Sequence, residues 1–248
     1  MKEPPKSTNS MGRMWNLYKQ GGLTPAIASM LGSSNAQQMA FIRSMSRDQR
    51  KENALEMPLA DMEAVVFDLE TTGFNPYNGD EIISIGGVWI KGERFEDAEP
   101  FYRLVNPKRK IPPLVSELTG ISDEMAAKAP DLMQALHDFM DFAGKRVLIC
   151  HGSGHDKPFL NAALWRTSKV NLTHRVVDTM MIAKWLDPKQ PYYGLDEVLK
   201  RYGVEIATRH HALHDSIMTA KLFFRFLREI ASRQVTTLGE LYAYLSRH

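Results

Sequence analysis

The chain has 248 residues, of which 44% are hydrophobic and 24% charged, which is ordinary for one globular domain with or without an extension. The formal net charge of +2 is too small to indicate nucleic-acid binding by itself, so any basic surface has to be local. Cys150 is the only cysteine, which excludes an intrachain disulfide and suits a reducing compartment. No apolar run reaches the ~18 residues of a membrane span, and the N-terminus lacks the apolar core of a signal peptide. We therefore expect a cytoplasmic protein.

Residues 1–60 differ in composition from the rest and are predicted to form an N-terminal extension, partly disordered and partly helical. Its polar start is expected to be disordered. Helical periodicity follows in two short pieces, with breaks at Gly21-Gly22 and at Gly32-Ser33-Ser34. Arg47 and Arg50 make the arm locally basic. Two interpretations remain open: helices that pack on the main domain or on a partner, and an arm that contacts nucleic acid.

Residues 61–235 read as one α/β domain, and residues 236–248 as a C-terminal helix. Three strands come first, and strands then alternate with helices, which predicts a mixed five-stranded sheet flanked by helices. Gly86-Gly87 within the second strand suggests a bulge or a close backbone approach. The predicted strands are 64–68, 81–90, 100–105, 146–150 and 176–178. The predicted helices are 131–142, 156–165, a helix ending at 186, 195–202, 214–233 and 238–245.

The first predicted strand delivers two acids, Asp68 and Glu70, into a loop of small polar residues. The two side chains point the same way, because side chains alternate along a strand. An unpaired buried charge costs several kcal/mol, so a buried strand rarely ends in two acids without compensation. A divalent cation is the usual compensation.

Two further acids fall where the same architecture could bring them near the first pair. Asp156 follows the fourth strand at the start of a helix, and Asp215 lies in the first turn of the last long helix. Carboxylate oxygens select Mg²⁺ or Mn²⁺ over zinc. Two such ions about 4 Å apart form the clamp for in-line attack on a phosphodiester. His210 precedes Asp215 by five residues and could take the proton from the attacking water.

These residues carry a resemblance to a known family. Asp68-Leu69-Glu70-Thr71-Thr72-Gly73, the later Asp156, and His210-His211-Ala212-Leu213-His214-Asp215 resemble the three motifs of the DEDDh 3′→5′ exonucleases. This group includes the proofreading epsilon subunit of bacterial DNA polymerase III, ribonuclease T and oligoribonuclease. The likeness spans residues 62–230. The segments Phe101–Pro107, Leu118–Ser122 and Val177–Thr179 also resemble the family's connecting segments.

The resemblance implies a ribonuclease H-like fold, a two-metal mechanism and release of nucleoside 5′-monophosphates. It implies His210 as general base, and a backbone around Leu69, Thr71 and Thr72 that holds the terminal nucleotide. The implied ligands of two Mg²⁺ or Mn²⁺ ions are Asp68, Glu70, Asp156 and Asp215.

Two departures from the family pattern stand out. The second motif usually reads His-Asn-Ala-x-Phe-Asp, whereas this chain has Gly152 and His155 in place of the Asn and the Phe. The third motif usually carries an acid just before its last Asp, whereas this chain has His214. We expect the first change to alter substrate preference more than metal binding.

Each acid also has an ordinary structural interpretation. Asp68 and Glu70 could belong to a surface turn, Asp156 could be a helix N-cap, and Asp215 could interact with the helix dipole. For Asp178 a cap of the following helix is favoured over metal binding.

Other side chains of the motifs invite further interpretations. The histidines of the third motif, or Cys150 with His151 and His155, could suggest zinc, but neither set has a recognised spacing. His211 and His214 are expected to be solvated or to face phosphate. Phe223, Phe224 and Phe226 are assigned to the core rather than to base stacking.

We therefore predict a metal-dependent 3′→5′ exonuclease that acts on single-stranded 3′ ends, with DNA favoured. RNA is the alternative substrate, since nothing in the sequence reads the 2′-hydroxyl. A different class of function, an adaptor or proofreading subunit that docks a polymerase or a helicase through residues 1–60, is compatible with the same motifs. No membrane partner is expected.

Overall fold

The computed structural model describes residues 25–48 and 54–246. The chain divides into two units, residues 1–38 and 39–248, and the second unit contains the sheet. The predicted domain boundaries at residues 60 and 235 stay predictions. No helix within the described ranges is long and apolar enough to cross a membrane.

The described part of the extension consists of one α-helix, α2 (Pro25–Asp48), followed by short 3-10 turns from Ala54 on. The predicted break at Gly32-Ser33-Ser34 is wrong, because α2 continues through these residues. One glycine costs a helix only about 1 kcal/mol, and the Ala, Met and Gln residues of α2 are strong helix formers. The last turns pack within the second unit, where Ile42 is fully buried and Phe41 lies 4.7 Å from the His137 ring. The predicted break at Gly21-Gly22 and the polar start lie outside the described residues.

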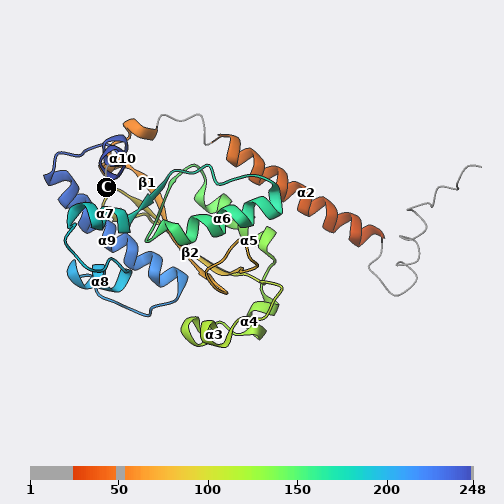
Figure 1. Ribbon diagram of the computed structural model, residues 1–248. Helices are drawn as coiled ribbons and strands as arrows, with labels where there is room; N and C mark the ends of the chain where they lie inside the picture. The colour runs from red at the N-terminus through yellow and green to blue at the C-terminus, as the bar shows by residue number, and fades with distance from the viewer. Residues whose placement is uncertain (1–24, 49–53, 247–248) are drawn as a thin grey trace, which may run out of the picture. The chain divides into compact units, whose positions relative to one another are not determined.

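The sheet has the mixed topology that the strand pattern predicted, with six strands rather than five (Figure 1). Its order is β3-β2-β1-β5-β6, and β4 also pairs with β2. The pairs of β2 with β1, β3 and β4 are antiparallel, whereas β1–β5 and β5–β6 are parallel. The extra strand is the two-residue β3. The strands are β1 (Glu63–Thr71), β2 (Ile82–Lys91), β3 (Arg94–Phe95), β4 (Phe101–Leu104), β5 (Val147–Cys150) and β6 (Val176–Asp178).

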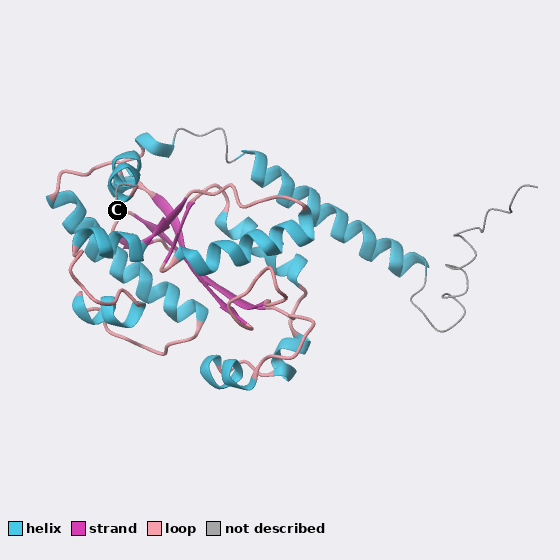
Figure 2. Cartoon of the chain, viewed as in Figure 1, coloured by secondary structure: helices cyan, strands magenta, loops and turns pink. Residues whose placement is uncertain are grey.

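Helices cover both faces of the sheet (Figure 2). Two short helices between β4 and α5 were not predicted, because neither has a buried apolar stripe long enough to give a periodic signal. The helices of this unit are α3 (Pro113–Thr119), α4 (Asp123–Lys128), α5 (Leu132–Ala143), α6 (Ser153–Ser168), α7 (Thr179–Leu186), α8 (Leu195–Arg201), α9 (Ala212–Ser232) and α10 (Leu238–Leu245), with the 3-10 turns η2 (Ala54–Glu56) and η3 (Leu59–Asp61).

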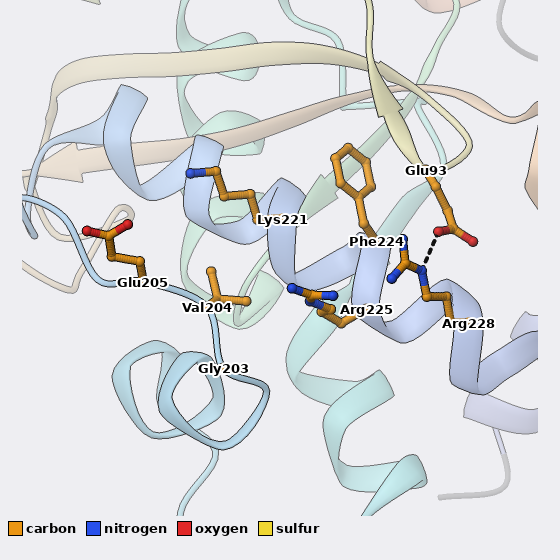
Figure 3. A pocket seen from close by; sticks show the side chains of 8 residues that line it. All are labelled: Glu93, Gly203, Val204, Glu205, Lys221, Phe224, Arg225 and Arg228. Carbon is orange, nitrogen blue, oxygen red and sulfur yellow. Dashed lines mark hydrogen bonds and ion pairs between the residues drawn. The ribbon is translucent and has the colours of Figure 1, made fainter.

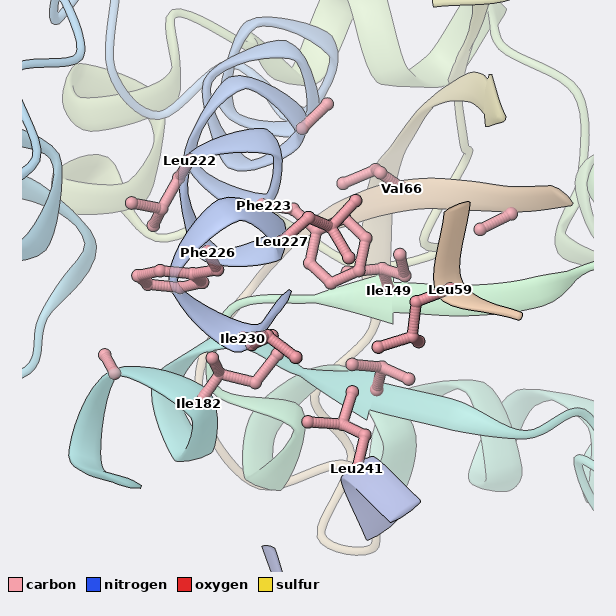
Figure 4. Close-up of a cluster of buried hydrophobic side chains, with 14 of the residues drawn as sticks. Leu59, Val66, Ile149, Ile182, Leu222, Phe223, Phe226, Leu227, Ile230 and Leu241 are labelled. Atoms are coloured by element: carbon pink, nitrogen blue, oxygen red, sulfur yellow. The ribbon is translucent and has the colours of Figure 1, made fainter. Parts of the chain in front are cut away.

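Alternation along β1 divides the core into two clusters. Val66 faces the cluster under α7, α8, α9 and α10, where Phe223 and Phe226 are fully buried (Figure 4). Val65 and Phe67 face the cluster under α5 and α6. Burial on both faces explains why the strand reads as a continuous apolar run. The assignment to the core is confirmed for Phe223 and Phe226, whereas Phe224 is half-buried and packs against the cluster.

Candidate active site

The strand β1 carries the first two acids inside the sheet. β1 continues through Thr71, so the predicted end of the strand at Asp68 is wrong. The cause is long-range pairing, since Asp68 lies opposite Gly86 and Glu70 opposite Ser84 on β2. Alternation then places both carboxylates on one face, while Leu69 between them is buried in the opposite cluster.

Helix α9 brings the third acid to the same face. Its first turn lies directly on Gly86, where a Cβ atom would overlap the backbone of Ala212 and Leu213. This close approach is the role that the Gly86-Gly87 pair suggested. Asp215 in that first turn is 3% exposed. Ligand oxygens of Asp68, Glu70 and Asp215 all lie within 4.8 Å of one another.

Asp156 is the fourth acid, and it approaches from the start of α6. The helix begins at Ser153 with Gly152 as its N-cap, so Asp156 lies in the first turn and is not the cap. The side chain is 2% exposed and is hydrogen-bonded to the Cys150 thiol. Asp156 is outside the set of three within 4.8 Å, yet it is close enough to raise the pKa of Asp68 through charge repulsion.

Burial and mutual repulsion dominate the electrostatics of these acids. Burial raises the pKa of Asp68 well above its ordinary value, and Asp156, Glu70 and Asp215 raise it further. Burial and the Asp215 carboxylate raise the pKa of Glu70 to about 7. Asp68 and Glu70 are half-buried, and Asp156 and Asp215 are buried. Carboxylates that are shielded from water and repel one another need a compensating charge, and oxygen-only donors fit a hard divalent cation.

Arg209 supplies one positive charge beside the acids, and sequence reasoning missed it. Its guanidinium forms ion pairs with both Asp215 and Asp196. It lowers the pKa of Glu70, although less than burial and Asp215 raise it. The contact with Asp196 depends on the fold of the α8–α9 connection, so no local pattern indicates it.

His210 lies at the turn into α9. Its backbone has φ of 57°, in the left-handed region, and its N–H donates to Asp215 Oδ2 at 3.0 Å. The residue is exposed. The structure therefore ties the backbone of His210 to the acid cluster and leaves its ring open to solvent.

The altered second motif is held by hydrogen bonds within the protein. His151 bonds Thr179 Oγ1 at 2.9 Å and the Tyr193 carbonyl at 2.8 Å, so it is a structural residue. Asp178 accepts from the N–H groups of Gly152, Ser153 and Met180 at 2.8–2.9 Å. The predicted capping role of Asp178 on α7 is confirmed, and the same carboxylate also holds the start of α6. Gly152 has φ of 81°, which favours glycine there.

His155 replaces the family's phenylalanine and lies beside Thr71, with 3.3 Å between its Nε2 and the threonine Oγ1. The side chain of Thr72 bonds Asp80 Oδ1 at 3.1 Å. Among the described residues, no cluster of histidine and cysteine with metal-binding geometry is present, so the zinc interpretations gain no support.

His211 and His214 are half-buried and stack on each other with ring centroids 4.2 Å apart. The other face of His211 stacks on Tyr102 at 4.5 Å. Tyr102 lies on β4 opposite Gly86 of β2. The two histidines therefore help to pack α9 against β4, a contact that the prediction of solvated rings did not include.

A hollow of about 270 Å³ on another part of α9 holds none of these residues (Figure 3). Lys221, Phe224 and Arg225 line it, and Arg228 there pairs with Glu93 at 2.6 Å. The acid cluster is thus separate from this basic hollow.

Comparisons with known proteins agree with the fold. The profile of the exonuclease family matches residues 65–223. A PolC-type DNA polymerase III of Streptococcus pneumoniae is 34% identical over 190 residues, which is 76% of this chain and 13% of that protein. A DNA polymerase III subunit epsilon-like protein of Rhodobacter capsulatus is 36% identical over 200 residues, covering 79% of this chain and 28% of that one.

Solved structures with the same fold are also nucleases. Exonuclease X, solved with 5′-overhanging duplex DNA, has a TM-score of 0.56 at 21% identity and covers 68% of this chain and 93% of its own. The nuclease domain of 3′hExo, described as a DEDDh family member, has a TM-score of 0.58 at 23% identity and covers 67% of this chain and 92% of its own.

The mixed α/β sheet is thus the fold of these solved nucleases, one of which is described as a DEDDh family member. The chain belongs to the exonuclease family, and residues 65–223 form its family domain. It spans 13% of the PolC-type polymerases and 28% of the epsilon-like protein that it matches.

Proposed function

We propose that this protein hydrolyses the phosphodiester bond at single-stranded 3′ ends and releases nucleoside 5′-monophosphates. The observation that carries the proposal is the cluster of Asp68, Glu70 and Asp215, whose ligand oxygens lie within 4.8 Å of one another. The buried Asp156 next to this cluster completes the acid set.

The four acids would hold two Mg²⁺ or Mn²⁺ ions. Their burial and the raised pKa values of Asp68, Glu70 and Asp156 support this, since the ionised cluster needs added positive charge. When bound, the two ions would lower the pKa of the attacking water and stabilise the leaving oxygen.

His210 would act as the general base that takes the proton from the attacking water. Its support is positional. The backbone N–H bonds the Asp215 carboxylate at 3.0 Å, so the residue stays at the cluster, while its exposure leaves the ring free to meet a bound substrate.

The terminal nucleotide would lie against the end of β1, on the backbone around Leu69, Thr71 and Thr72. The side chains of these residues are engaged within the protein, because Leu69 is buried, Thr71 bonds the Gly73 carbonyl and Thr72 bonds Asp80. This bonding supports a preformed surface rather than one that orders on binding.

DNA is our preferred substrate, in a proofreading or repair role. It is supported by the relatives named as DNA polymerase III proteins. RNA is the second candidate, supported by the structural likeness to a 3′-exonuclease solved with a histone mRNA stem-loop, with a TM-score of 0.60 at 20% identity. Digestion of matched DNA and RNA oligomers in parallel decides between them.

Docking of a polymerase or a helicase through residues 1–60 is a further part of the proposal. The PolC-type relatives, in which the matching segment is 13% of a polymerase, support an association with replication. Deletion of residues 1–38 keeps the buried Ile42, so it should weaken the association and leave the chemistry intact, and unchanged association would contradict docking through this part of the arm. The cytoplasmic location stays a prediction.

The proposed activity is tested with Asp68→Ala. Removal of this carboxylate should abolish Mg²⁺- or Mn²⁺-dependent release of nucleotides from a labelled 3′ end, measured with and without chelator. Asp97→Ala is the matched control, because Asp97 is exposed and is not in the acid cluster. Full activity of Asp68→Ala would contradict the proposal.

A further inference from the structure

Two adjoining hollows lie between α6 and the loop that follows β1. The first has a volume of about 300 Å³ and the second about 270 Å³, and both are lined by Pro76 and Tyr77 of that loop. Helix α6 lines the first hollow with Gly154, His155 and Pro158. It lines the second with Asn161, Ala162, Trp165 and Arg166.

The residues that α6 contributes are spaced three and four apart, so they form one face of the helix. From Gly154 to Trp165 this face extends about 16 Å, at 1.5 Å per residue. The first hollow reaches the end of β1, because the Nε2 atom of its lining residue His155 lies 3.3 Å from Thr71 Oγ1. Since the two hollows share Pro76 and Tyr77, together they form a track that leads away from the residues proposed to hold the terminal nucleotide.

Two large aromatic side chains are exposed along the second hollow. Tyr77 is 76% exposed and Trp165 is 54% exposed. The ammonium of Lys169 lies 5.8 Å from the centre of the Trp165 ring. Exposed aromatic rings beside amide side chains suit the stacking and hydrogen bonding of nucleobases, and the exposed Asn78 and Asn171 border the two hollows.

The loop that carries Tyr77 is fastened on both sides. Asp80 accepts from the Asn75 N–H at 3.0 Å and pairs with Arg109 at 3.0 Å. Arg166 of α6 pairs through both its terminal nitrogens with Glu81 at the end of the loop. Since the loop is tied to α6, the spacing of Tyr77 and Trp165 is set before any ligand binds, which lowers the entropy cost of binding.

We propose that the second hollow binds bases of the substrate strand beyond the penultimate nucleotide, on the 5′ side of the terminal one, by stacking on Tyr77 and Trp165. This inference rests on the proposed exonuclease function. Single-stranded nucleic acid is favoured over a protein ligand because the track begins beside Thr71 at the end of β1 and carries amide donors. Arg166 is already paired with Glu81, so binding here depends on stacking more than on charge.

The test compares a dinucleotide with an octadeoxynucleotide as substrates for the full chain and its variants. Trp165→Ala and Tyr77→Ala should each raise KM for the octamer about tenfold, as expected for the loss of one base–aromatic stack. The kcat should stay near the wild-type value, and KM for the dinucleotide should not change. Trp165→Phe should restore most of the octamer affinity, and the salt dependence of KM should be unchanged.

Tyr192→Ala is the matched control, because Tyr192 is 70% exposed and offers only its carbonyl to Arg201. Thermal unfolding of each variant checks the fold.

A chromogenic ester of thymidine 5′-monophosphate, which has no 5′ strand, tests the chemistry alone. If wild type fails on that ester and on every oligomer, the proposed function is wrong. The stacking proposal is wrong if the wild-type protein is active but Trp165→Ala and Tyr77→Ala raise KM equally for the dinucleotide and the octamer. It is also wrong if both variants digest every oligomer as the wild-type protein does. The second outcome would indicate that this surface binds a protein partner instead.

Discussion

Helices α9 and α6 each carry a buried acid to the same cluster, but they are positioned by different means. α9 rests its backbone on Gly86, with no side chain between them. α6 is held by the Asp178 carboxylate, which accepts three backbone N–H groups from the starts of α6 and α7. The position of Asp215 therefore depends on shape, whereas that of Asp156 depends on hydrogen bonds. A helix in direct steric contact with the sheet cannot shift to accommodate an added group, whereas a helix held by hydrogen bonds can shift slightly.

Gly86→Ala should have the largest effect. The added methyl group has to displace the first turn of α9, so we expect stability to fall by about 3 kcal/mol, typical of severe overpacking. Displacement of Asp215 by about 1 Å should reduce nucleotide release about a hundredfold. Urea unfolding and a 3′-end release assay measure the two effects.

Gly87→Ala is the matched control for the neighbouring position. A Cβ atom there would lie 3.3 Å from the Phe142 ring, so the contact is with a side chain rather than with the backbone of a helix. We expect a much smaller loss of stability and nearly full activity. Equal losses for the two variants would contradict the account of how α9 is seated.

Asp178→Ala should have an intermediate effect. Three backbone donors lose a charged acceptor, which we expect to cost about 2 kcal/mol because the freed N–H groups can find water. Activity should fall about tenfold, with Asp156 less well placed. Asp131→Ala removes the cap of α5 through a single bond to Gln134 and should cost only about 1 kcal/mol without loss of activity. The two variants are compared by chemical denaturation and by initial rates. If Asp178→Ala changed neither stability nor activity, the claim that hydrogen bonds to Asp178 position α6 would be contradicted.

The smallest expected effect is the pH dependence of stability that arises from the acids between the two helices. Burial raises the pKa of Glu70 from 4.5 to about 7, so the folded protein binds this proton more tightly than the unfolded chain does. The stability that the proton contributes is present below pH 4.5 and is lost as pH rises through about 7. The Tm of the metal-free protein, measured in chelator, should therefore fall by a few degrees across this window.

Glu70→Gln should flatten that pH profile, because the amide carries no proton to lose. Added Mn²⁺ should restore the Tm of the wild-type protein above pH 7, and a pH profile identical in the two proteins would show that Glu70 is not the group responsible.

Sequence reasoning succeeded where the signal is local. Asp68 and Glu70 alternate along one strand, and Asp156 and Asp215 each lie in the first turn of a helix, so their placement followed from short patterns. It failed where contacts between residues distant in the sequence determine the structure. β1 extends to Thr71 because β2 lies beside it, and Arg209 reaches both Asp215 and Asp196 only in the folded protein.

The central claim, that four acids from β1, α6 and α9 hold two divalent ions, is tested by calorimetric titration with Mn²⁺. The titration is run with thymidine 5′-monophosphate present, so that the product completes the site. We expect two ions per chain for the wild-type protein and weaker binding of at least one ion for Asp68→Asn and Asp156→Asn. Binding of no Mn²⁺, or titrations identical in all three proteins, would contradict the account.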